Sequence, residues 1–270
     1  MNCFVCGSTG LRELTLTAGQ TGRPISIKEC LECGYQRNAA VRTLADAIRI
    51  QGHFELEVPT SRPKPTWFSR DAILARRIGA LSAKSQGRIL DIGCNSGAFL
   101  STFKANWERE GVELSNKLSS VARERLPGCK IHSLPFEALD LESGSFDIVT
   151  SFAVIEHVYD PRRFVLEAFR ILKPGGLLVL MTGDRGSEMA RRYGDDWPLY
   201  LSPDHVSYFN ADSVLSLVRS AGFEISRVEW RYLNRGYTST ISRVFEKLTD
   251  LVSLTRPRIH DACYVYGVKT

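Results

Sequence analysis

The chain has 270 residues, of which 43% are apolar, with a mean hydropathy of -0.13 and a formal net charge of +5. These values exclude a disordered or fibrous chain and fit a globular protein with one large core and a small appendage. The longest apolar runs, such as residues 176–181, are far shorter than the roughly 20 residues of a membrane helix. The N-terminus also lacks a signal-peptide pattern, so we expect a cytoplasmic protein with no transmembrane segment.

Two cysteine pairs lie near the N-terminus, in the stretches CFVCG and CLECG: Cys3, Cys6, Cys30 and Cys33. In a cytosolic chain, paired C-x-x-C motifs indicate metal binding rather than disulfides. The glycine after each pair permits a tight turn that directs two thiolates at one point. We therefore predict a tetrahedral, structural zinc site, with four free thiols or a redox dithiol as the alternative.

The segment between these pairs alternates apolar and polar residues, as two short strands joined by a turn at residues 17–24 would. The alternating apolar residues are Leu14, Leu16, Ile25 and Ile27. A unit this small folds only with its metal. The sequence thus predicts a zinc ribbon over residues 1–38.

Residues 39–66 are predicted to be a helical segment and a linker. The stretch VRTLADAIRI, residues 41–50, has helix character, and VPTSRPKPT, residues 58–66, contains three prolines. Closely spaced prolines favour an extended connector. We place the domain boundary there, with a second domain over residues 67–270.

Strand and helix patterns alternate in the second domain. Strands are predicted at residues 88–92, 111–114, 129–132, 146–152 and 177–182. Ser115, Asp160 and Asn210 are expected to cap helices between or after them, and residues 173–176, KPGG, to form the turn before the fifth strand. This order predicts an α/β domain with a doubly wound, mostly parallel sheet covered by helices on both faces.

The loop after the first of these strands reads Gly93-Cys94-Asn95-Ser96-Gly97 and follows Asp91. A dinucleotide loop would read G-x-G-x-x-G, with a glycine where the pyrophosphate approaches the backbone. The G-x-x-x-G spacing suits another ligand. An amino-acid tail could place its carboxylate near the helix N-terminus and its ammonium near Asp91.

These residues resemble the first motif of the class I S-adenosylmethionine-dependent methyltransferases. Asp91, Gly93, Cys94 and Gly97 match that motif, and Asn95 stands where a glycine is common. Asparagine tolerates left-handed backbone angles better than most residues. The resemblance covers roughly residues 67–182 and 204–223, and it implies a Rossmann-like sheet of seven strands and S-adenosylmethionine as the methyl donor.

The resemblance also implies further contacts with the cofactor. Glu113, 22 residues after Asp91, ends the second strand and would accept hydrogen bonds from the ribose hydroxyls, with Leu114 beside it. Residues after the third and fourth strands would contact the adenine and flank the cofactor: Ser133, Leu134, Phe152 and Ala153.

The segment from Pro203 to Glu224 resembles bacterial small-molecule methyltransferases of sugar, polysaccharide and natural-product pathways. His205 is the first candidate for the base that removes the acceptor's proton, and His157 is the second. Tyr208 or Asp204 could orient either imidazole. The alternatives are a packing role for His205 and a framework role for His157. Residues 191–205 are interpreted as a lid loop with few helix signals.

An insertion at about 233–258 has a helical pattern. It is interpreted as a helix on the sheet or in a dimer contact, with a peripheral contact to a membrane surface as the alternative. The sequence does not indicate an oligomeric state.

Three functions follow from these features. The first is methyl transfer to a small-molecule acceptor that is sugar-like, lipid-linked or a natural product. The second is an RNA methyltransferase in which the ribbon grips nucleic acid, although the ribbon has few basic residues for phosphate contacts. The third is a non-catalytic scaffold that binds the cofactor.

Overall fold

The computed structural model describes residues 2–17, 19, 22, 24–52, 70–231 and 260–270. Two predicted features, the proline-rich connector at 58–66 and the helical insertion at 233–258, lie outside the described residues. Within the described ranges, no helix combines the length and the apolar character needed to cross a membrane.

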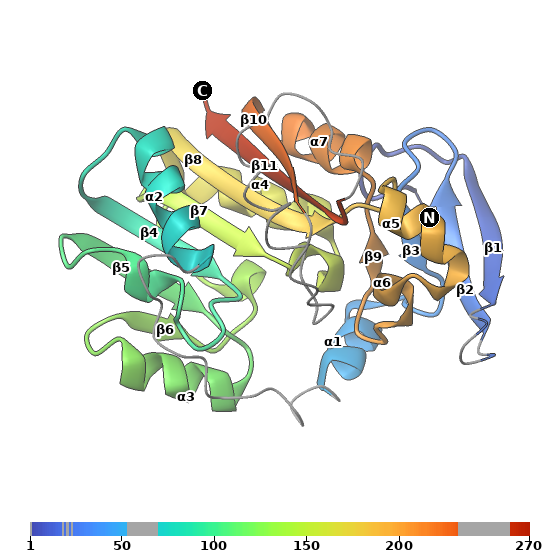
Figure 1. The fold of residues 1–270 in the computed structure, drawn as a ribbon, viewed down its shortest axis with the longest axis horizontal. Helices are drawn as coiled ribbons and strands as arrows, with labels where there is room; N and C mark the ends of the chain where they lie inside the picture. Colours follow the sequence, from blue (N-terminus) through green and yellow to red (C-terminus); the bar gives the residue numbers. More distant parts are fainter. Residues whose placement is uncertain (1, 18, 20–21, 23, 53–69, 232–259) are drawn as a thin grey trace, which may run out of the picture.

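The larger sheet has seven strands in the order β10-β11-β8-β7-β4-β5-β6 (Figure 1). Its strands are β4 Gly87–Ile92, β5 Trp107–Val112, β6 Lys130–His132, β7 Phe146–Phe152, β8 Leu172–Gly183, β10 Phe223–Arg231 and β11 Ala262–Lys269. Strands β4 to β8 run parallel, and β11 lies antiparallel between β8 and β10. The predicted doubly wound, mostly parallel sheet of seven strands is confirmed.

Helices cover both faces of this sheet. Helices α2 Arg70–Ser82 and α3 Asn116–Arg125 lie on one face, and α4 Pro161–Ile171 and α7 Ala211–Ser220 lie on the other. Neighbouring strand residues divide between two cores accordingly, because successive side chains point to opposite faces. Ile89 packs toward α2, whereas Leu90 packs toward α4. The predicted caps Ser115, Asp160 and Asn210 each accept a hydrogen bond from the first helical turn.

Two strand boundaries differ from the prediction. Strand β5 begins at Trp107 rather than at residue 111, because its charged Glu110 is buried against Arg88 and His132 and hides the strand pattern. The KPGG residues are not a turn before β8 but an irregular part of it. The pairing of β7 with β8 shifts register there, between Phe146 and Ile148.

A second, four-stranded sheet contains the N-terminal cysteines. It has the order β1-β2-β3-β9, with β1 Leu11–Thr17, β2 Pro24–Cys30, β3 Gln36–Asn38 and β9 Ser207–Tyr208. We call residues 2–38 the cysteine ribbon; α1, Leu44–Gly52, follows it. Strands β1 and β2 lie at the opposite end of the molecule from β5 and β6 (Figure 1). The ribbon is therefore joined to the larger domain by strand pairing with residues that lie about 170 positions later in the chain.

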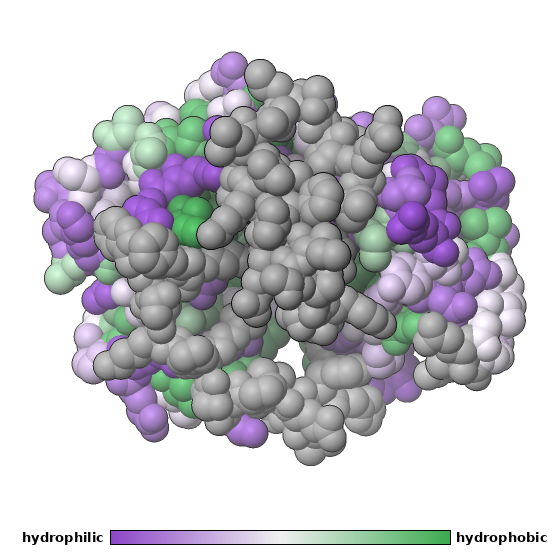
Figure 2. All heavy atoms as spheres, in the orientation of Figure 1, coloured by the Kyte–Doolittle hydropathy of each residue, from purple (hydrophilic) through white to green (hydrophobic). Residues whose placement is uncertain are grey.

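The segment before β9 is helical, contrary to the predicted loop. It contains α5 Glu188–Tyr193, a 3-10 turn at Gly194–Asp196 and α6 Pro198–Leu201. Ser187 caps α5, but helices of six and four residues are too short to show a periodic pattern. Short 3-10 turns at Leu100–Thr102, Phe136–Ala138 and Ile155–His157 complete the described elements. Hydrophilic and hydrophobic residues are interspersed over the coloured part of the face in Figure 2.

Candidate active site

The loop after β4 has a backbone that requires glycine at two positions. Gly93 and Gly97 have φ angles of +75° and +72°. A Cβ atom on Gly93 would lie 2.3 Å from Val154 Cγ2, and one on Gly97 would lie 2.9 Å from Leu126 Cδ1. Asn95, with φ of +52°, adopts the left-handed conformation that asparagine tolerates. Gly93 therefore brings the loop into direct contact with the segment that follows β7.

Glu113 fixes the other side of this loop. Its two carboxylate oxygens accept hydrogen bonds from the Asn95 and Ser115 amides, both at 2.9 Å. Burial raises the pKa of this carboxyl. Each carboxylate oxygen can accept more than one hydrogen bond, so the group can also bind hydroxyls of a ligand.

Asp91 lies beneath the loop and is only 2% exposed. Its carboxylate accepts a hydrogen bond from the Thr150 hydroxyl at 2.7 Å. Burial raises the pKa of Asp91 to about 7. A cationic ligand group nearby would favour the ionised carboxylate, because opposite charges stabilise each other at low dielectric.

The Cys94 side chain points away from the loop surface. A Cβ atom on Gly111 of β5 would lie 2.6 Å from Cys94 Sγ, so the thiol packs over that glycine. Burial raises the pKa of this thiol. Cys94 thus offers a ligand its backbone and not its side chain.

Two predicted adenine-side residues expose apolar side chains. Leu114 and Leu134 are 48% and 57% exposed, and they follow the neighbouring strands β5 and β6. The Ser133 hydroxyl accepts a hydrogen bond from Arg123 at 2.7 Å. Exposed leucines at one edge of the sheet can cover the apolar face of a ligand ring.

Phe152 and Ala153 end strand β7 in a constrained geometry. The Phe152 ring packs edge-on against Phe99, with ring centroids 5.1 Å apart. Ala153 has φ of +55°, which is unfavourable for a residue with a Cβ atom. Such strain is typical of functional sites. Here it turns the chain toward Val154, the residue that contacts Gly93.

The two predicted histidines lie together. The His157 and His205 ring centroids are 4.7 Å apart. The Val206 amide donates to the Glu156 carbonyl at 2.8 Å, which places the His205 segment beside the turn after β7. His205 is 4% exposed, and burial lowers its pKa to about 4. His205 is therefore a neutral imidazole at physiological pH.

Sequence reasoning missed Glu156, which joins these histidines. Its side chain is buried and accepts a hydrogen bond from the Thr182 hydroxyl at 3.0 Å. Glu156, Thr182 and His205 line a small cavity together with Gly183 at the end of β8. The only sequence signal was its position next to His157, four residues after the strand predicted at 146–152.

Tyr208 contacts the backbone rather than an imidazole nitrogen. Its hydroxyl donates to the His205 carbonyl at 3.3 Å, and burial raises its pKa. In this geometry Tyr208 holds the chain that carries His205. Asp204, the other predicted orienting residue, has its carbonyl 3.1 Å from His157 Nδ1.

The cysteine ribbon packs against the segment that carries His205. The Tyr35 and Ser207 hydroxyls are 2.6 Å apart, and the Tyr200 hydroxyl donates to Gln36 at 2.6 Å. One apolar cluster contains ribbon and lid residues: Leu14, Leu16, Ile25, Ile27, Trp197, Leu199, Tyr200 and Tyr208. The position of His205 therefore depends on the ribbon, a link that the sequence does not reveal.

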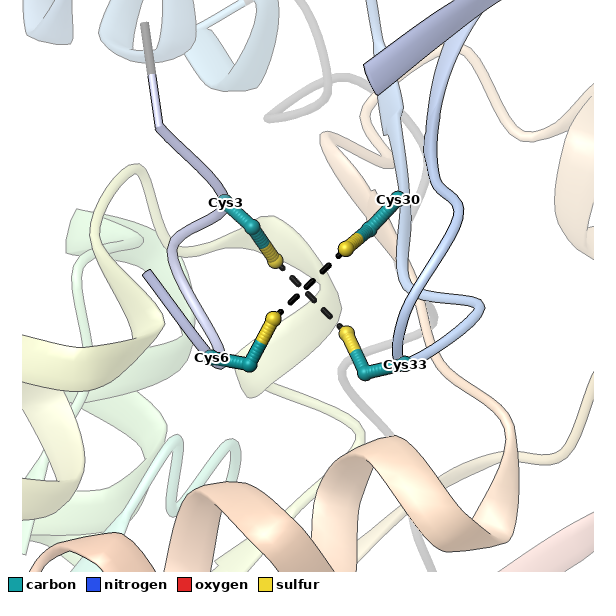
Figure 3. A group of neighbouring side chains, drawn as sticks. All are labelled: Cys3, Cys6, Cys30 and Cys33. Carbon is teal, nitrogen blue, oxygen red and sulfur yellow. Dashed lines mark hydrogen bonds between the residues drawn. The ribbon is translucent and has the colours of Figure 1, made fainter. Parts of the chain in front are cut away.

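The four ribbon cysteines converge on one point (Figure 3). Cys3 Sγ lies 3.6 Å from Cys33 Sγ, and Cys6 Sγ lies 3.6 Å from Cys30 Sγ. A tetrahedral zinc ion with Zn–S bonds of 2.3 Å would separate its sulfurs by about 3.8 Å. The donor set and its spacing therefore fit a four-cysteine zinc ion.

A buried cation packs on Phe4, which lies between Cys3 and Cys6 in the sequence. The Arg37 guanidinium is stacked over the rings of Phe4 and Tyr159, 4.4 and 4.6 Å from their centroids. Within the described chain it has no carboxylate partner, and its Nη2 has no hydrogen-bond partner. Zinc bound to four thiolates has a net charge of -2, which a nearby arginine would partly neutralise.

Comparisons with known proteins agree with this geometry. Residues 67–228 match the family described as methyltransferase domain. A Mycolicibacterium smegmatis protein named "Probable S-adenosylmethionine-dependent methyltransferase" is 32% identical over 185 residues, covering 67% of this chain and 68% of its own. The ubiquinone biosynthesis O-methyltransferase of Aromatoleum aromaticum is 30% identical over 174 residues, covering 60% of this chain and 70% of its own.

A solved structure shares the fold. It is described as an S-adenosylmethionine-dependent methyltransferase, possible histamine N-methyltransferase, of Thermotoga maritima, with a TM-score of 0.54 and 25% sequence identity. The match covers 76% of this chain and 93% of that chain.

Proposed function

Because this chain belongs to the S-adenosylmethionine-dependent methyltransferase family, we propose that it transfers the methyl group of S-adenosylmethionine to a small-molecule acceptor. The observation that carries this proposal is a contact. Gly93, in the loop that Glu113 holds, touches Val154, two residues before the buried Glu156 and three before His157. A cofactor bound on that loop would place its reacting methyl group near His157 and His205.

The residues of the loop have separable roles in this proposal. Glu113 binds the ribose hydroxyls, and Asp91 supplies negative charge beneath the cationic amino-acid end. The backbone of Gly93, Cys94, Asn95 and Gly97 surrounds the methionine moiety. Leu114, Ser133 and Leu134 border the adenine, and Phe152 and Ala153 flank the cofactor next to the acceptor.

The bound cofactor supplies an activated methyl group: the S–C bond breaks with its electron pair moving to sulfur, while an acceptor lone pair forms the new bond to carbon. The protein has to orient the two reactants, which can provide most of the acceleration. A hydroxyl acceptor must also lose its proton. His157 and His205 form the part of the site where that proton is removed, and Tyr208 holds the His205 backbone.

The acceptor is proposed to be a sugar-like, lipid-linked or natural-product molecule that carries a hydroxyl group. The Aromatoleum aromaticum relative is named as a ubiquinone biosynthesis O-methyltransferase, which supports a hydroxyl group as the methylated group. The apolar face of the ribbon is used in packing against residues 197–208, which supports a role in shaping the site rather than in gripping RNA.

The four ribbon cysteines are proposed to hold a structural zinc ion. The 3.6 Å separations within the two sulfur pairs support this assignment. Four protein ligands would fill every coordination position of the ion. The ion would therefore stabilise the ribbon that packs against the His205 segment and take no part in methyl transfer.

The proposal is tested with purified protein, methyl-labelled S-adenosylmethionine and fractions of a native cell extract. We expect label in a small-molecule fraction, and no label with His205→Ala, although that variant binds S-adenosylmethionine with the affinity of the wild type in calorimetry. Label that enters RNA would favour an RNA acceptor over a small-molecule acceptor. Absence of S-adenosylmethionine binding by the zinc-loaded protein would refute both.

A further inference from the structure

We propose that Glu156, His157 and His205 form a binding site for a divalent metal ion, separate from the four-cysteine site. One donor atom from each of the three residues lies within 4.8 Å of the other two. This inference deepens the proposed function, because a cation here would bind the hydroxyl oxygen of the acceptor. The three residues come from two segments, the turn after β7 and the loop before β9.

Both imidazoles are oriented as metal ligands are. His205 Nδ1 lies 2.8 Å from the Leu199 carbonyl oxygen, and His157 Nδ1 lies 3.1 Å from the Asp204 carbonyl oxygen. A carbonyl oxygen can only accept, so Nδ1 is the protonated nitrogen in each ring. The Asp204 carboxylate also lies 3.3 Å from His157 Nδ1. In the neutral form of each ring, this tautomer leaves the lone pair on Nε2. Histidines that bind metals commonly donate their other N–H to a carbonyl or carboxylate in this way.

Among the described residues, the Glu156 carboxyl forms no ion pair with a lysine or arginine. The Glu156 side chain is buried, and the Thr182 hydroxyl donates one hydrogen bond to it. Burying a carboxylate without a cationic partner is costly, and a divalent ion between Glu156 and the two imidazoles would remove that cost.

Another buried glutamate–histidine pair shows the contrast. Glu110 lies 2.9 Å from His132 at the far edge of the sheet, but Arg88 also contacts it at 2.6 Å. The charge of Glu110 is thus neutralised by the protein itself. Among the described residues, Glu156, His157 and His205 are the one group of possible nitrogen and oxygen ligands that combines two imidazoles with a carboxylate. That carboxylate has no lysine or arginine partner in the same part of the chain.

The donor set indicates which ions would bind. Two imidazoles and one carboxylate suit zinc, manganese, cobalt or iron in the divalent state. Metal–ligand bonds of about 2.1 Å require donor separations of roughly 3 to 3.4 Å, so the three side chains would close around the ion. Three protein ligands leave positions open for oxygen atoms. With both Nε2 lone pairs on the ion, neither imidazole would act as the base. A coordinated acceptor hydroxyl would instead release its proton to water at this cluster and attack as the oxyanion.

Manganese is the best probe, because thiolates bind it poorly and the ribbon cysteines would not compete. The full-length, zinc-loaded protein is titrated with Mn²⁺ while the free ion is followed by electron paramagnetic resonance. We expect one Mn²⁺ per chain. Glu156→Gln keeps the shape and can still accept from Thr182, yet it should weaken binding at least about 100-fold, as should His205→Ala.

The controls separate loss of ligands from loss of fold. Glu110→Gln alters the other buried pair and should leave Mn²⁺ binding unchanged. Calorimetry with S-adenosylmethionine shows that each variant is folded, and it also tests the proposed function independently. Wild-type protein that binds S-adenosylmethionine but no Mn²⁺, Co²⁺ or added Zn²⁺ would overturn the metal site alone. Equal Mn²⁺ binding by wild type, Glu156→Gln and His205→Ala would overturn it as well.

Discussion

The loop after β4 and the segment around His205 both contact the turn after β7, but they are built in different ways. The loop is local: five consecutive residues from Gly93 to Gly97, held by Glu113 from the neighbouring strand. The His205 segment depends on two distant parts of the chain, because Tyr35 contacts Ser207 and the Glu156 carbonyl accepts from the Val206 amide. The loop, which we propose as the cofactor end of the site, is therefore determined by nearby residues. The His205 segment, which we propose as the acceptor end, depends on tertiary packing and the ribbon.

The largest expected effect is a loss of stability when the proposed zinc site of the ribbon is removed, because the His205 segment packs on the ribbon. Cys6→Ser removes one proposed zinc ligand, and we expect a loss of about 4 kcal/mol in unfolding free energy, because structural zinc supplies folding energy directly. For a domain of this size, that lowers the melting temperature by roughly 8 to 16 °C, measured by calorimetry. Cys129→Ser, a cysteine outside the ribbon, is the matched control and should change stability little. Equal melting temperatures for the two variants would contradict a structural zinc ion.

The next effect breaks the cofactor end. Gly93→Ala places a methyl group against Val154 at a φ of +75°, so the loop must move. We expect S-adenosylmethionine affinity to fall at least about 100-fold, or roughly 3 kcal/mol, in isothermal titration. Gly128→Ala has a similar φ of +84° and no atom within 4 Å. That control should lose about 1 kcal/mol of stability and keep its affinity. If Gly93→Ala retained full affinity, the loop would not be the cofactor site.

A pH series sharpens the role of Asp91. Its pKa is raised to about 7 by burial, so the free protein favours the protonated acid below that pH. The folded state then binds more protons than the unfolded state between about pH 4 and 7, and this group destabilises the protein as pH rises through that window. A cationic ligand favours the ionised form. S-adenosylmethionine should therefore bind about tenfold more tightly at pH 8 than at pH 6.

Asp91→Asn is the control for titration of the ligand itself. We expect the variant to bind more weakly and to lose the tenfold dependence on pH. A variant with the same pH profile as the wild type would show that Asp91 does not face the cationic end of the ligand.

The smallest expected effect comes from the contact between the ribbon and the His205 segment. It tests whether that contact positions the segment or only packs against it. Tyr35→Phe removes the hydroxyl that lies 2.6 Å from the Ser207 hydroxyl, at an expected cost of about 1 kcal/mol. S-adenosylmethionine affinity should stay constant while methyl transfer decreases. Tyr266→Phe removes a buried hydroxyl that has no hydrogen-bond partner in the described part of the chain. It should leave both stability and transfer unchanged, and equal loss in both variants would argue against a specific link between Tyr35 and the acceptor site.

The sequence predicts the geometry of the loop after β4 more completely than that of the His205 segment. Asp91, Gly93 and Glu113 follow strand patterns that are visible in the chain, and the structure brings them to one edge. The histidines were visible as residue types, but their contact was not. Glu156 and Tyr35 were missed, because nothing in the pattern of apolar residues shows which distant segments will pair. The short helices at residues 188–201 were missed because they are shorter than the period needed to detect them.

One measurement tests the separation of the two ends most directly: S-adenosylmethionine binding and label transfer to the small-molecule fraction, compared in wild type, Gly93→Ala and His205→Ala. The account predicts that Gly93→Ala loses both activities and that His205→Ala binds as the wild type does but transfers no label. Full transfer by His205→Ala, or loss of cofactor binding in a folded His205→Ala protein, would contradict it.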